Sequence, residues 1–377
     1  MVKFALKLLL VGLPVIWMTS VNYVVDPNHK VHGWEEGSEE GIADLLIQQK
    51  NVTGLPPFND RKVARLYIEK SYRQQDIIVL GSSRTMEVQS ADFRGARFFN
   101  HSVLGGTIQD SFSIYDIYSQ WHIVPRAVVL DVDASAFNIN NTLLQFSAGL
   151  LLNSDADIEE RLGLKVPLRR SLERELEKGL QLVSPAIFQI AIKEILRRPE
   201  IRPHAIAEPN HDQTLLLADG SRRIFSVTSK RSAADVHRDV AAYVTTRPIS
   251  TLEDYGTLDL SDEAFLDRFV GLLQEDGVRV VLLLIPFHPV AYDVIRNDAN
   301  YRRVFDAERF VRQMGARQHV IVAGSYDPEI AGCSESDFYD ALHAKHGCVE
   351  HILATNRIRD RLLDDRWEDA GGAEVDR

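Results

Sequence analysis

A short apolar run that ends in Gly-Ser-Ser is the feature that most constrains the fold. Residues 77–80 read Ile-Ile-Val-Leu and lead directly into Gly81, Ser82 and Ser83. An unbroken apolar run that ends at a glycine predicts a buried strand of a parallel sheet. Ligands of open α/β sheets bind beyond the carboxyl ends of the strands. Ser83 is therefore a candidate nucleophile, although a serine-rich loop that only caps the next helix would explain the same residues.

Four later apolar segments continue this pattern. We expect strands within residues 96–103, 127–133, 278–285 and 319–323, with helical segments between them. Strands that alternate with helices predict a three-layer α/β/α domain, here with a five-stranded parallel sheet. We place this domain at residues 61–365, with a mainly helical insertion at about 140–255. Residues 201–255 are polar and expected to be irregular, and residues 366–377 form a polar tail that we expect to be flexible.

A second motif lies near the other end of the chain. Asp340 precedes His343 by three residues. An Asp at this spacing can orient the imidazole tautomer that takes a proton from a serine. By itself the spacing arises by chance in many chains, so it gains weight only beside a serine at a strand end. The Gly-x-Ser-x-Gly signature of α/β-hydrolases is absent, because Thr85 stands where its last glycine belongs.

A glycine pair follows the second predicted strand. Gly105 and Gly106 precede Thr107, and Asp110 completes a capping-box pattern, so a helix is expected to begin here. Backbone N–H groups before a helix can hold an oxyanion. The alternative is a tight turn that needs glycine only for its backbone dihedrals.

The N-terminus has the pattern of an export signal. Lys3 and Lys7 precede a mostly apolar run over residues 8–25, about 18 residues and near the lower limit for a membrane-spanning helix. Lysines before the run favour a cytoplasmic amino end. We therefore expect an uncleaved anchor at residues 1–25, with a cleaved signal peptide as the alternative. Residues 26–60 are expected to be a juxtamembrane stretch of loops and a short helix.

The two cysteines, Cys333 and Cys348, bracket the Asp340–His343 motif. In an oxidising compartment they would form a disulfide that closes a loop of about 15 residues. Two free thiols are the alternative. A zinc site that also uses His343 and His346 is possible on paper, although the spacing is not that of a zinc finger or ribbon.

Composition excludes one class of function. The 377-residue chain has a formal net charge of −11, whereas a nucleic-acid-binding surface needs a basic face. We therefore expect no nucleic-acid partner. No cofactor and no metal are expected at the site.

Taken together, these motifs resemble the SGNH (GDSL-type) hydrolase superfamily over residues 76–138 and 260–360. The apparent anchor and the Gly-Ser-Ser form look closer to its cell-envelope branch, which includes alginate-type O-acetyltransferases and the lipoteichoic-acid D-alanylation protein. The resemblance implies a flavodoxin-like strand order. It also implies Ser83 as nucleophile, His343 as base and Asp340 as its orienting acid, with the N–H groups of Ser83 and Gly105 (or Gly106) as the oxyanion hole.

Two positions depart from the family pattern. Ser82 stands where most of the family has an Asp before the nucleophile. The envelope branch shares this departure. The third-block Asn is out of register, because Asp133 lies nearest and Asn138 follows five residues later. We therefore regard Asp133 and Asn138 as candidate oxyanion-hole residues. Arg84 and His288, which also follow predicted strands, are candidate substrate contacts.

The resemblance implies acyl transfer or acyl-ester hydrolysis on a cell-envelope polysaccharide. It also implies a bacterial inner-membrane location with the globular part in the periplasm, a glycan acceptor, and an acyl donor supplied by a membrane acyl exporter. A catalytically silent glycan-binding or scaffolding subunit is the alternative from another class. A metal-dependent hydrolase that uses Asp340, His343 and His346 is the third hypothesis.

Overall fold

The computed structural model describes residues 2–25, 38–55, 58–141, 155–165, 176, 179–180, 182–196, 202–207, 214–223 and 231–363. Its centre is a five-stranded sheet in the order β3-β2-β4-β8-β9. The strands are β2 (Ile77–Leu80), β3 (Phe98–Asn100), β4 (Ala127–Asp131), β8 (Arg279–Leu284) and β9 (Ile321–Gly324). Every neighbouring pair is parallel. The predicted five-stranded parallel sheet is therefore confirmed.

The register brings the carboxyl ends of the central strands together. Leu80 of β2 pairs with Leu130 of β4, which pairs with Leu282 of β8. The residues that follow these strands therefore lie at one edge of the sheet, where ligands of open α/β sheets bind. All four residues of β2 are buried, as expected of a strand covered on both faces.

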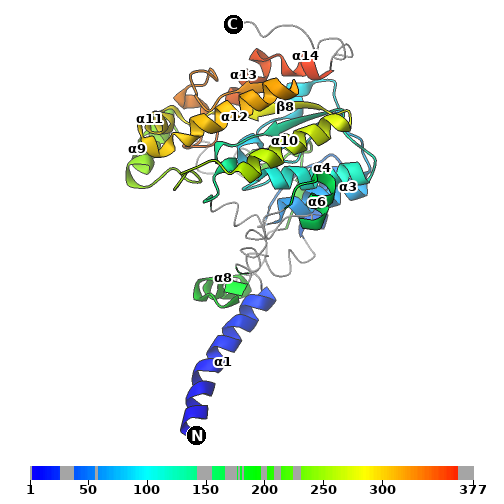
Figure 1. Ribbon diagram of the computed structural model, residues 1–377. Coiled ribbons are helices and arrows are strands. Elements are labelled where there is room, and N and C mark those ends of the chain that lie inside the picture. The colour runs from blue at the N-terminus through cyan, green and yellow to red at the C-terminus, as the bar shows by residue number, and fades with distance from the viewer. Residues whose placement is uncertain are drawn as a thin grey trace.

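Helices cover both faces of the sheet (Figure 1). Alternate strand residues pack into two separate cores. The larger core joins the sheet to α2 (Ser38–Ile47), α3 (Asp60–Ser71), α4 (Ile108–Gln120), α10 (Leu260–Glu275), α11 (Pro289–Asn297) and α12 (Arg303–Gln318). The smaller core joins it to α13 (His346–Thr355), α14 (Ile358–Leu363) and the short 3-10 helix η2 (Ser90–Phe93).

A second, antiparallel sheet was not expected from the sequence. It contains β5 (His204–Ile206), β1 (Asn51–Thr53), β6 (Leu215–Leu216) and β7 (Arg222–Arg223), in that order. β1 lies in the stretch predicted to hold only loops and a short helix, and α2 in the same stretch contributes Ile42 and Leu46 to the larger core. These strands have two or three residues each, too few to show a periodic pattern.

The predicted insertion is mixed in structure. It holds α6 (Asp155–Leu162), α8 (Pro185–Leu196), three strands of the second sheet and α9 (Ala233–Thr246). The expectation that residues 201–255 are irregular is wrong, because α9 occupies part of them, with Ser232 as its N-cap. Its buried face contains only Val236 and Val240, so the sequence has little of the apolar periodicity that predicts an amphipathic helix. The predicted tail, residues 366–377, lies outside the described residues.

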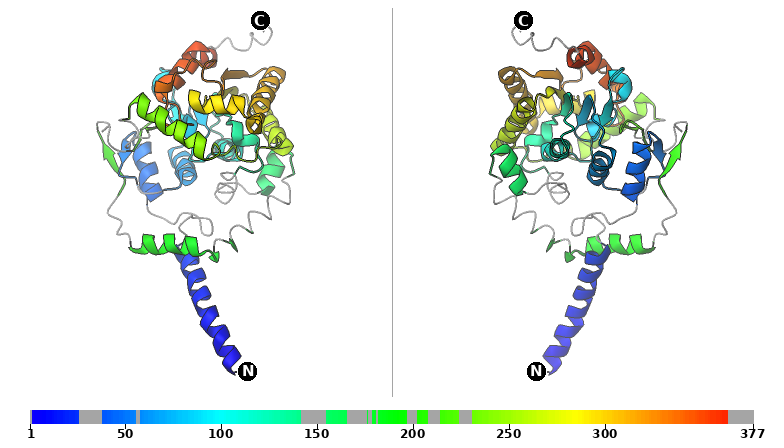
Figure 2. Two further views of the ribbon diagram at one scale, coloured as in Figure 1. Left: turned by 90° about the vertical axis from the view of Figure 1, so that its left-hand side faces the viewer. Right: turned by 90° about the vertical axis from the view of Figure 1, so that its right-hand side faces the viewer.

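Helix α1 (Val2–Val25) projects from the main body, and α8 lies across its end (Figure 2). Trp17 packs edge-on against Phe188, and the Asn22 amide donates to the carbonyl oxygens of Leu182 and Ser184. Within the described part of the chain, no helix combines the length and apolar character that a membrane span requires.

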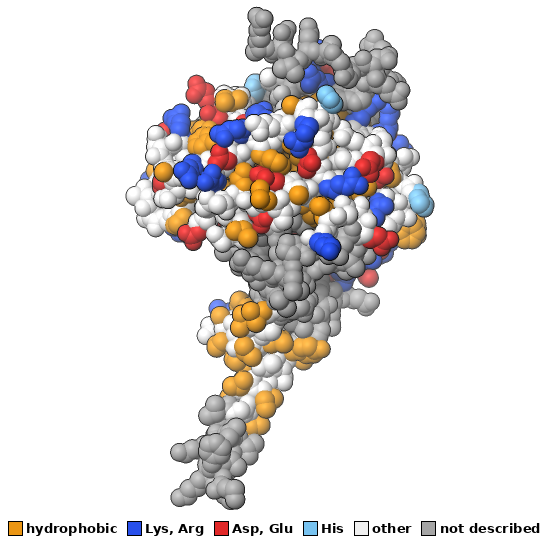
Figure 3. Space-filling model, in the orientation of Figure 1, with side chains coloured by type: hydrophobic (Ala, Val, Ile, Leu, Met, Phe, Trp, Pro, Cys, Tyr) orange, Lys and Arg blue, Asp and Glu red, His pale blue; other side chains and the backbone are white. Residues whose placement is uncertain are grey.

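Charged side chains of both signs are mixed on the face shown in Figure 3. Lys and Arg alternate there with Asp and Glu across the main body, and apolar side chains gather around α1 and α8. Among the described side chains of this face, basic residues form no continuous stripe of the kind that follows a phosphate backbone.

Candidate active site

The candidate nucleophile follows β2 directly. Ser83 is the first residue of the short 3-10 helix η1 (Ser83–Thr85), and Ser82 caps that helix by accepting a hydrogen bond from the Arg84 N–H. The Ser82 N–H and hydroxyl both donate to the Asp131 carboxylate at the end of β4, at 3.0 and 2.6 Å. The turn that presents Ser83 is therefore held by the neighbouring strand.

Ser83, His343 and Asp340 form a connected chain of hydrogen bonds. The Ser83 Oγ lies 2.9 Å from His343 Nε2. On the other side of the ring, His343 Nδ1 lies 2.9 Å from Asp340 Oδ2. With its proton on Nδ1, the imidazole donates to Asp340 and accepts from the serine hydroxyl. This is the arrangement in which a histidine activates a serine.

Asp340 is held as an anion. Burial alone would raise its pKa, but its hydrogen bond to His343, the His343 charge and the backbone N–H groups of Leu342 and His343 lower that pKa to about 2. The two N–H groups donate at 2.8 and 2.9 Å. Asp340 therefore orients the His343 ring and stabilises its protonated form.

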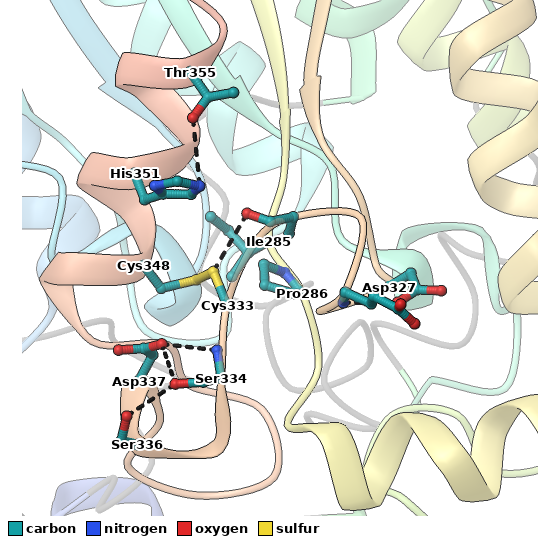
Figure 4. Close-up of a disulfide and its surroundings, with 12 residues drawn as sticks. Ile285, Pro286, Asp327, Cys333, Ser334, Ser336, Asp337, Cys348, His351 and Thr355 are labelled. Carbon is teal, nitrogen blue, oxygen red and sulfur yellow. Dashed lines mark hydrogen bonds between the residues drawn. A yellow bond between two sulfur atoms is a disulfide. The ribbon is translucent and has the colours of Figure 1, made fainter.

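The segment that carries Asp340 and His343 is closed by the predicted disulfide. Cys333 and Cys348 are joined, with their Cα atoms 5.4 Å apart, and the bond links this segment to α13 (Figure 4). Inside the closed loop, the Tyr339 N–H donates to the His343 carbonyl at 2.9 Å. Because both sulfurs are used, the alternatives of free thiols and of a zinc site built on these cysteines are excluded.

Arg84 and His288 contact protein groups. The Arg84 guanidinium donates to the carbonyl oxygens of Leu342, Ile285 and Pro286, and pairs with Asp133. The His288 side chain is buried, and its Nδ1 accepts from the Val290 N–H. Both residues thus lie inside the site's framework, where a positioning role suits them better than the predicted contact with substrate.

The Gly105–Gly106 turn packs against the nucleophile loop. Gly105 has a φ of +59°, a left-handed conformation that glycine tolerates best. The Gly106 N–H donates to the Val103 carbonyl at 3.0 Å, so this N–H is already used within the turn. In the part of the chain that the structure describes, the Ser83 N–H has no acceptor, as an oxyanion donor requires.

The two third-block candidates do not supply oxyanion donors. The Asn138 side chain is buried, and its amide donates to the carbonyl oxygens of Thr251 and Glu253. Burial would raise the pKa of Asp133, but the Arg84 charge and hydrogen bond lower it below its ordinary value, so Asp133 is a carboxylate that repels an oxyanion. In this structure the Asn138 amide is used by two carbonyl groups more than 110 residues away, and the Asp133 carboxylate is used by Arg84.

Sequence reasoning missed the residues that support the Gly105 turn. The Arg61 guanidinium binds both oxygens of the Asp110 carboxylate at 2.7 Å and donates to the carbonyl oxygens of Leu104 and Gly105. Asp60 accepts from the Leu104 N–H at 2.9 Å. Asp110 was identified only as part of the capping box, which the structure confirms. The contacts from α3 span more than forty residues, so no local pattern reveals them.

A hollow of about 340 Å³ adjoins the acid of the triad. On one side α9 contributes Val236, Val240 and Tyr243, and on the other the triad loop contributes Tyr339 and Leu342. Arg231, Asp239, Asp340 and Ala341 complete the lining. Its walls are mostly apolar with a few polar groups, a composition typical of ligand pockets.

A scan against protein-family models and a search of curated proteins both give no match to this chain. The resemblance to SGNH hydrolases therefore stays a prediction.

Proposed function

We propose that the protein is a serine-dependent acyltransferase or acyl esterase that acts on a cell-envelope polysaccharide. The observation that carries the proposal is the hydrogen-bonded chain from Ser83 through His343 to Asp340. These three side chains come from two loops at opposite ends of the sequence. Their alignment at the carboxyl ends of the strands is what acyl transfer by a serine nucleophile requires.

In the first half-reaction, His343 Nε2 takes the Ser83 proton while Ser83 Oγ attacks the ester carbonyl carbon. The Ser83 and Gly105 N–H groups are the proposed donors to the resulting oxyanion. As the intermediate collapses, the bond to the leaving oxygen breaks and His343 returns the proton to that oxygen. The acyl group is then an ester of Ser83, and the alcohol leaves.

In the second half-reaction, an acceptor hydroxyl gives its proton to His343 and attacks the acyl-serine carbonyl. The bond to Ser83 Oγ then breaks, and His343 returns the proton to that oxygen. Water as acceptor gives hydrolysis, and a sugar hydroxyl gives transfer. Which acceptor prevails depends on how well the site excludes water and binds glycan. The hollow beside Asp340, with Tyr243 and Tyr339 in its walls, supports a sugar acceptor.

The proposed location is the outer side of the bacterial inner membrane, with α1 as anchor. Exposed apolar side chains on α1, among them Leu13, Ile16 and Trp17, support a lipid contact. A membrane acyl exporter would supply the donor and an envelope glycan the acceptor. Membrane fractionation tests the location: a chain that stays in the membrane pellet after alkaline extraction supports the anchor, and complete release contradicts it.

The decisive experiment is intact-mass spectrometry of the full-length chain after incubation with a fluorophosphonate. Wild type is compared with Ser83→Ala, with His343→Ala, and with Ser336→Ala as a control, because Ser336 is an exposed serine near the same loop. We expect one adduct in wild type and Ser336→Ala, and none in the other two. A folded wild type that forms no adduct would instead favour the catalytically silent glycan-binding subunit.

A further inference from the structure

A second cluster of polar side chains lies where η2 meets α13, outside the Ser83 site. It consists of Asp92, His346 and Glu350, each of which places one ligand-type atom within 4.8 Å of the others. His346 and Glu350 are four residues apart on α13, so they share one face of the helix. Asp92 comes from a distant part of the sequence.

Asp92 has one carboxylate oxygen without a hydrogen bond. Its side chain is only 2% exposed. Asp92 Oδ2 accepts from the Gln89 N–H at 2.8 Å, within the capping box of η2. The other oxygen, Oδ1, is buried with no hydrogen-bond partner in the described residues. A buried carboxylate oxygen without a partner is energetically unfavourable, and a bound ligand at this atom would remove that cost.

The His346 ring is oriented toward that oxygen. Its Nδ1 lies 2.9 Å from the Glu87 carbonyl, which accepts its proton and leaves Nε2 with a free lone pair. Metal-binding histidines typically donate the N–H of their other ring nitrogen to a carbonyl or carboxylate, which fixes the orientation of the imidazole. Glu87 thus determines which nitrogen is available, and that nitrogen is the one that faces Asp92.

The distance between the two facing atoms suits a shared ion. His346 Nε2 and Asp92 Oδ1 are 3.6 Å apart, too far for a hydrogen bond. Two ligands of one tetrahedral Zn²⁺, with bonds of about 2.0–2.1 Å, lie about 3.3 Å from each other. A shift of a few tenths of an ångström would therefore let both atoms bind one ion.

We propose that Asp92, His346 and Glu350 bind a divalent transition-metal ion of the Zn²⁺ type. One imidazole and two carboxylates match the ligands that such ions accept, whereas Mg²⁺ and Ca²⁺ prefer oxygen ligands alone. The two carboxylates leave the cluster negatively charged when His346 is neutral, which also favours a cation.

The ion would have a structural task. It would tie η2, which follows the nucleophile loop, to the first turn of α13. The same helix carries Cys348, and it begins three residues after His343. A metal and a disulfide would then fix one helix at two points. This inference does not rest on the proposed acyl-transfer function.

Calorimetric titration of the full-length chain with Zn²⁺, after removal of metals by a chelator, tests the site. The ligand variants are Asp92→Asn, His346→Gln and Glu350→Gln. Glu350 is exposed, so its variant is expected to fold even if the others do not. The control is His237→Gln, because His237 makes an exposed 2.8 Å pair with Glu335 and belongs to no three-residue ligand cluster among the described residues.

We expect one Zn²⁺ per wild-type chain and a loss of affinity of at least about tenfold in each ligand variant, since even outer-shell changes cost that much. His237→Gln should bind like wild type, and Mg²⁺ should not compete. Zn²⁺ should also raise the unfolding midpoint of wild type more than that of Glu350→Gln. No Zn²⁺ binding by wild type would overturn the proposal, and equal binding by Glu350→Gln would show that the ion does not use this cluster and would overturn it as well.

Discussion

The Arg84 guanidinium donates a 3.2 Å hydrogen bond to the carbonyl oxygen of Leu342, the residue directly before His343. Arg84 also follows Ser83 directly. One buried side chain therefore connects the backbone of the base to the loop of the nucleophile. The His288 N–H, from the loop after β8, donates to the Ala341 carbonyl at 3.1 Å and so connects the triad loop to β8 as well.

We predict that Arg84→Lys lowers kcat by about 100-fold while KM changes little, because small displacements of reacting groups have effects of that size. Lysine keeps the charge but not the planar set of donors that reaches Leu342, Ile285 and Asp133 together. The measurement is ester turnover, with the rate of fluorophosphonate labelling as a second readout. Arg97→Lys, at an exposed ion pair, is the control. Unchanged kcat in Arg84→Lys would contradict the positioning role.

A pH-dependent stability difference is expected at Asp131. Burial and the nearby Asp133 charge raise its pKa from 3.8 to about 6. The folded chain therefore binds a proton between these pH values that the unfolded chain has already lost. Stability relative to Asp131→Asn must then fall as pH rises from about 4 to 6, by up to about 3 kcal/mol.

Urea unfolding of both proteins at several pH values measures this slope. Asp76→Asn is a control of opposite sign. The hydrogen bond from Arg97 lowers the Asp76 pKa despite partial burial, so wild type should gain stability over that variant as pH rises from below the folded-state pKa toward 3.8. A flat difference between wild type and Asp131→Asn would show that Asp131 stays ionised throughout.

Loss of the disulfide should destabilise the chain. Cys333 and Cys348 are 15 residues apart, and the chain-entropy model gives about 3 kcal/mol for a loop of this length. We expect the double variant Cys333→Ser/Cys348→Ser to unfold at a lower temperature and to turn over ester more slowly. A reducing agent should shift wild type in the same direction and leave the variant unchanged. Equal midpoints for oxidised and reduced wild type would refute this.

Gly106→Ala should disturb the nucleophile loop. An added Cβ would lie 2.3 Å from the Gly81 carbonyl oxygen, which is backbone and cannot rotate away. Overpacking of this kind costs about 1–3 kcal/mol, and here the displaced group immediately precedes Ser82. Activity and stability should therefore fall together. The control is Gly347→Ala in α13, where a Cβ meets no atom within 4 Å. A Gly106→Ala protein as active as that control would contradict the prediction.

The central sheet could be predicted because its strands contain short apolar runs, such as residues 77–80 and 280–284, that are buried on both faces. The antiparallel sheet could not, because strands as short as β6 and β7 have no measurable period. Helix α9 does have a local sequence pattern, an N-cap Ser232 followed three residues later by Asp235. In a polar segment this pattern alone did not predict a helix.

The residues of the candidate site likewise fall into those that local motifs identify and those that only the tertiary fold brings together. Ser83, Asp340 and His343 belong to local motifs, and each side chain could be identified where it stands in the sequence. The Arg61–Asp110 pair and the Ser82–Asp131 contact join residues 49 positions apart, so they depend on the tertiary fold. Asn138 has the residue type of the family pattern, but its amide donates to the carbonyl oxygens of Thr251 and Glu253, more than 110 residues away, and no local pattern reveals those contacts.

The sequence distance between Ser83 and His343 is 260 residues. During synthesis, the serine therefore emerges long before its base, and α13 follows only after β9 has been made. A nascent or C-terminally shortened chain carries a serine that nothing activates. Under the proposed acyl transfer, Ser83 therefore becomes reactive only after segments 260 residues apart have folded together.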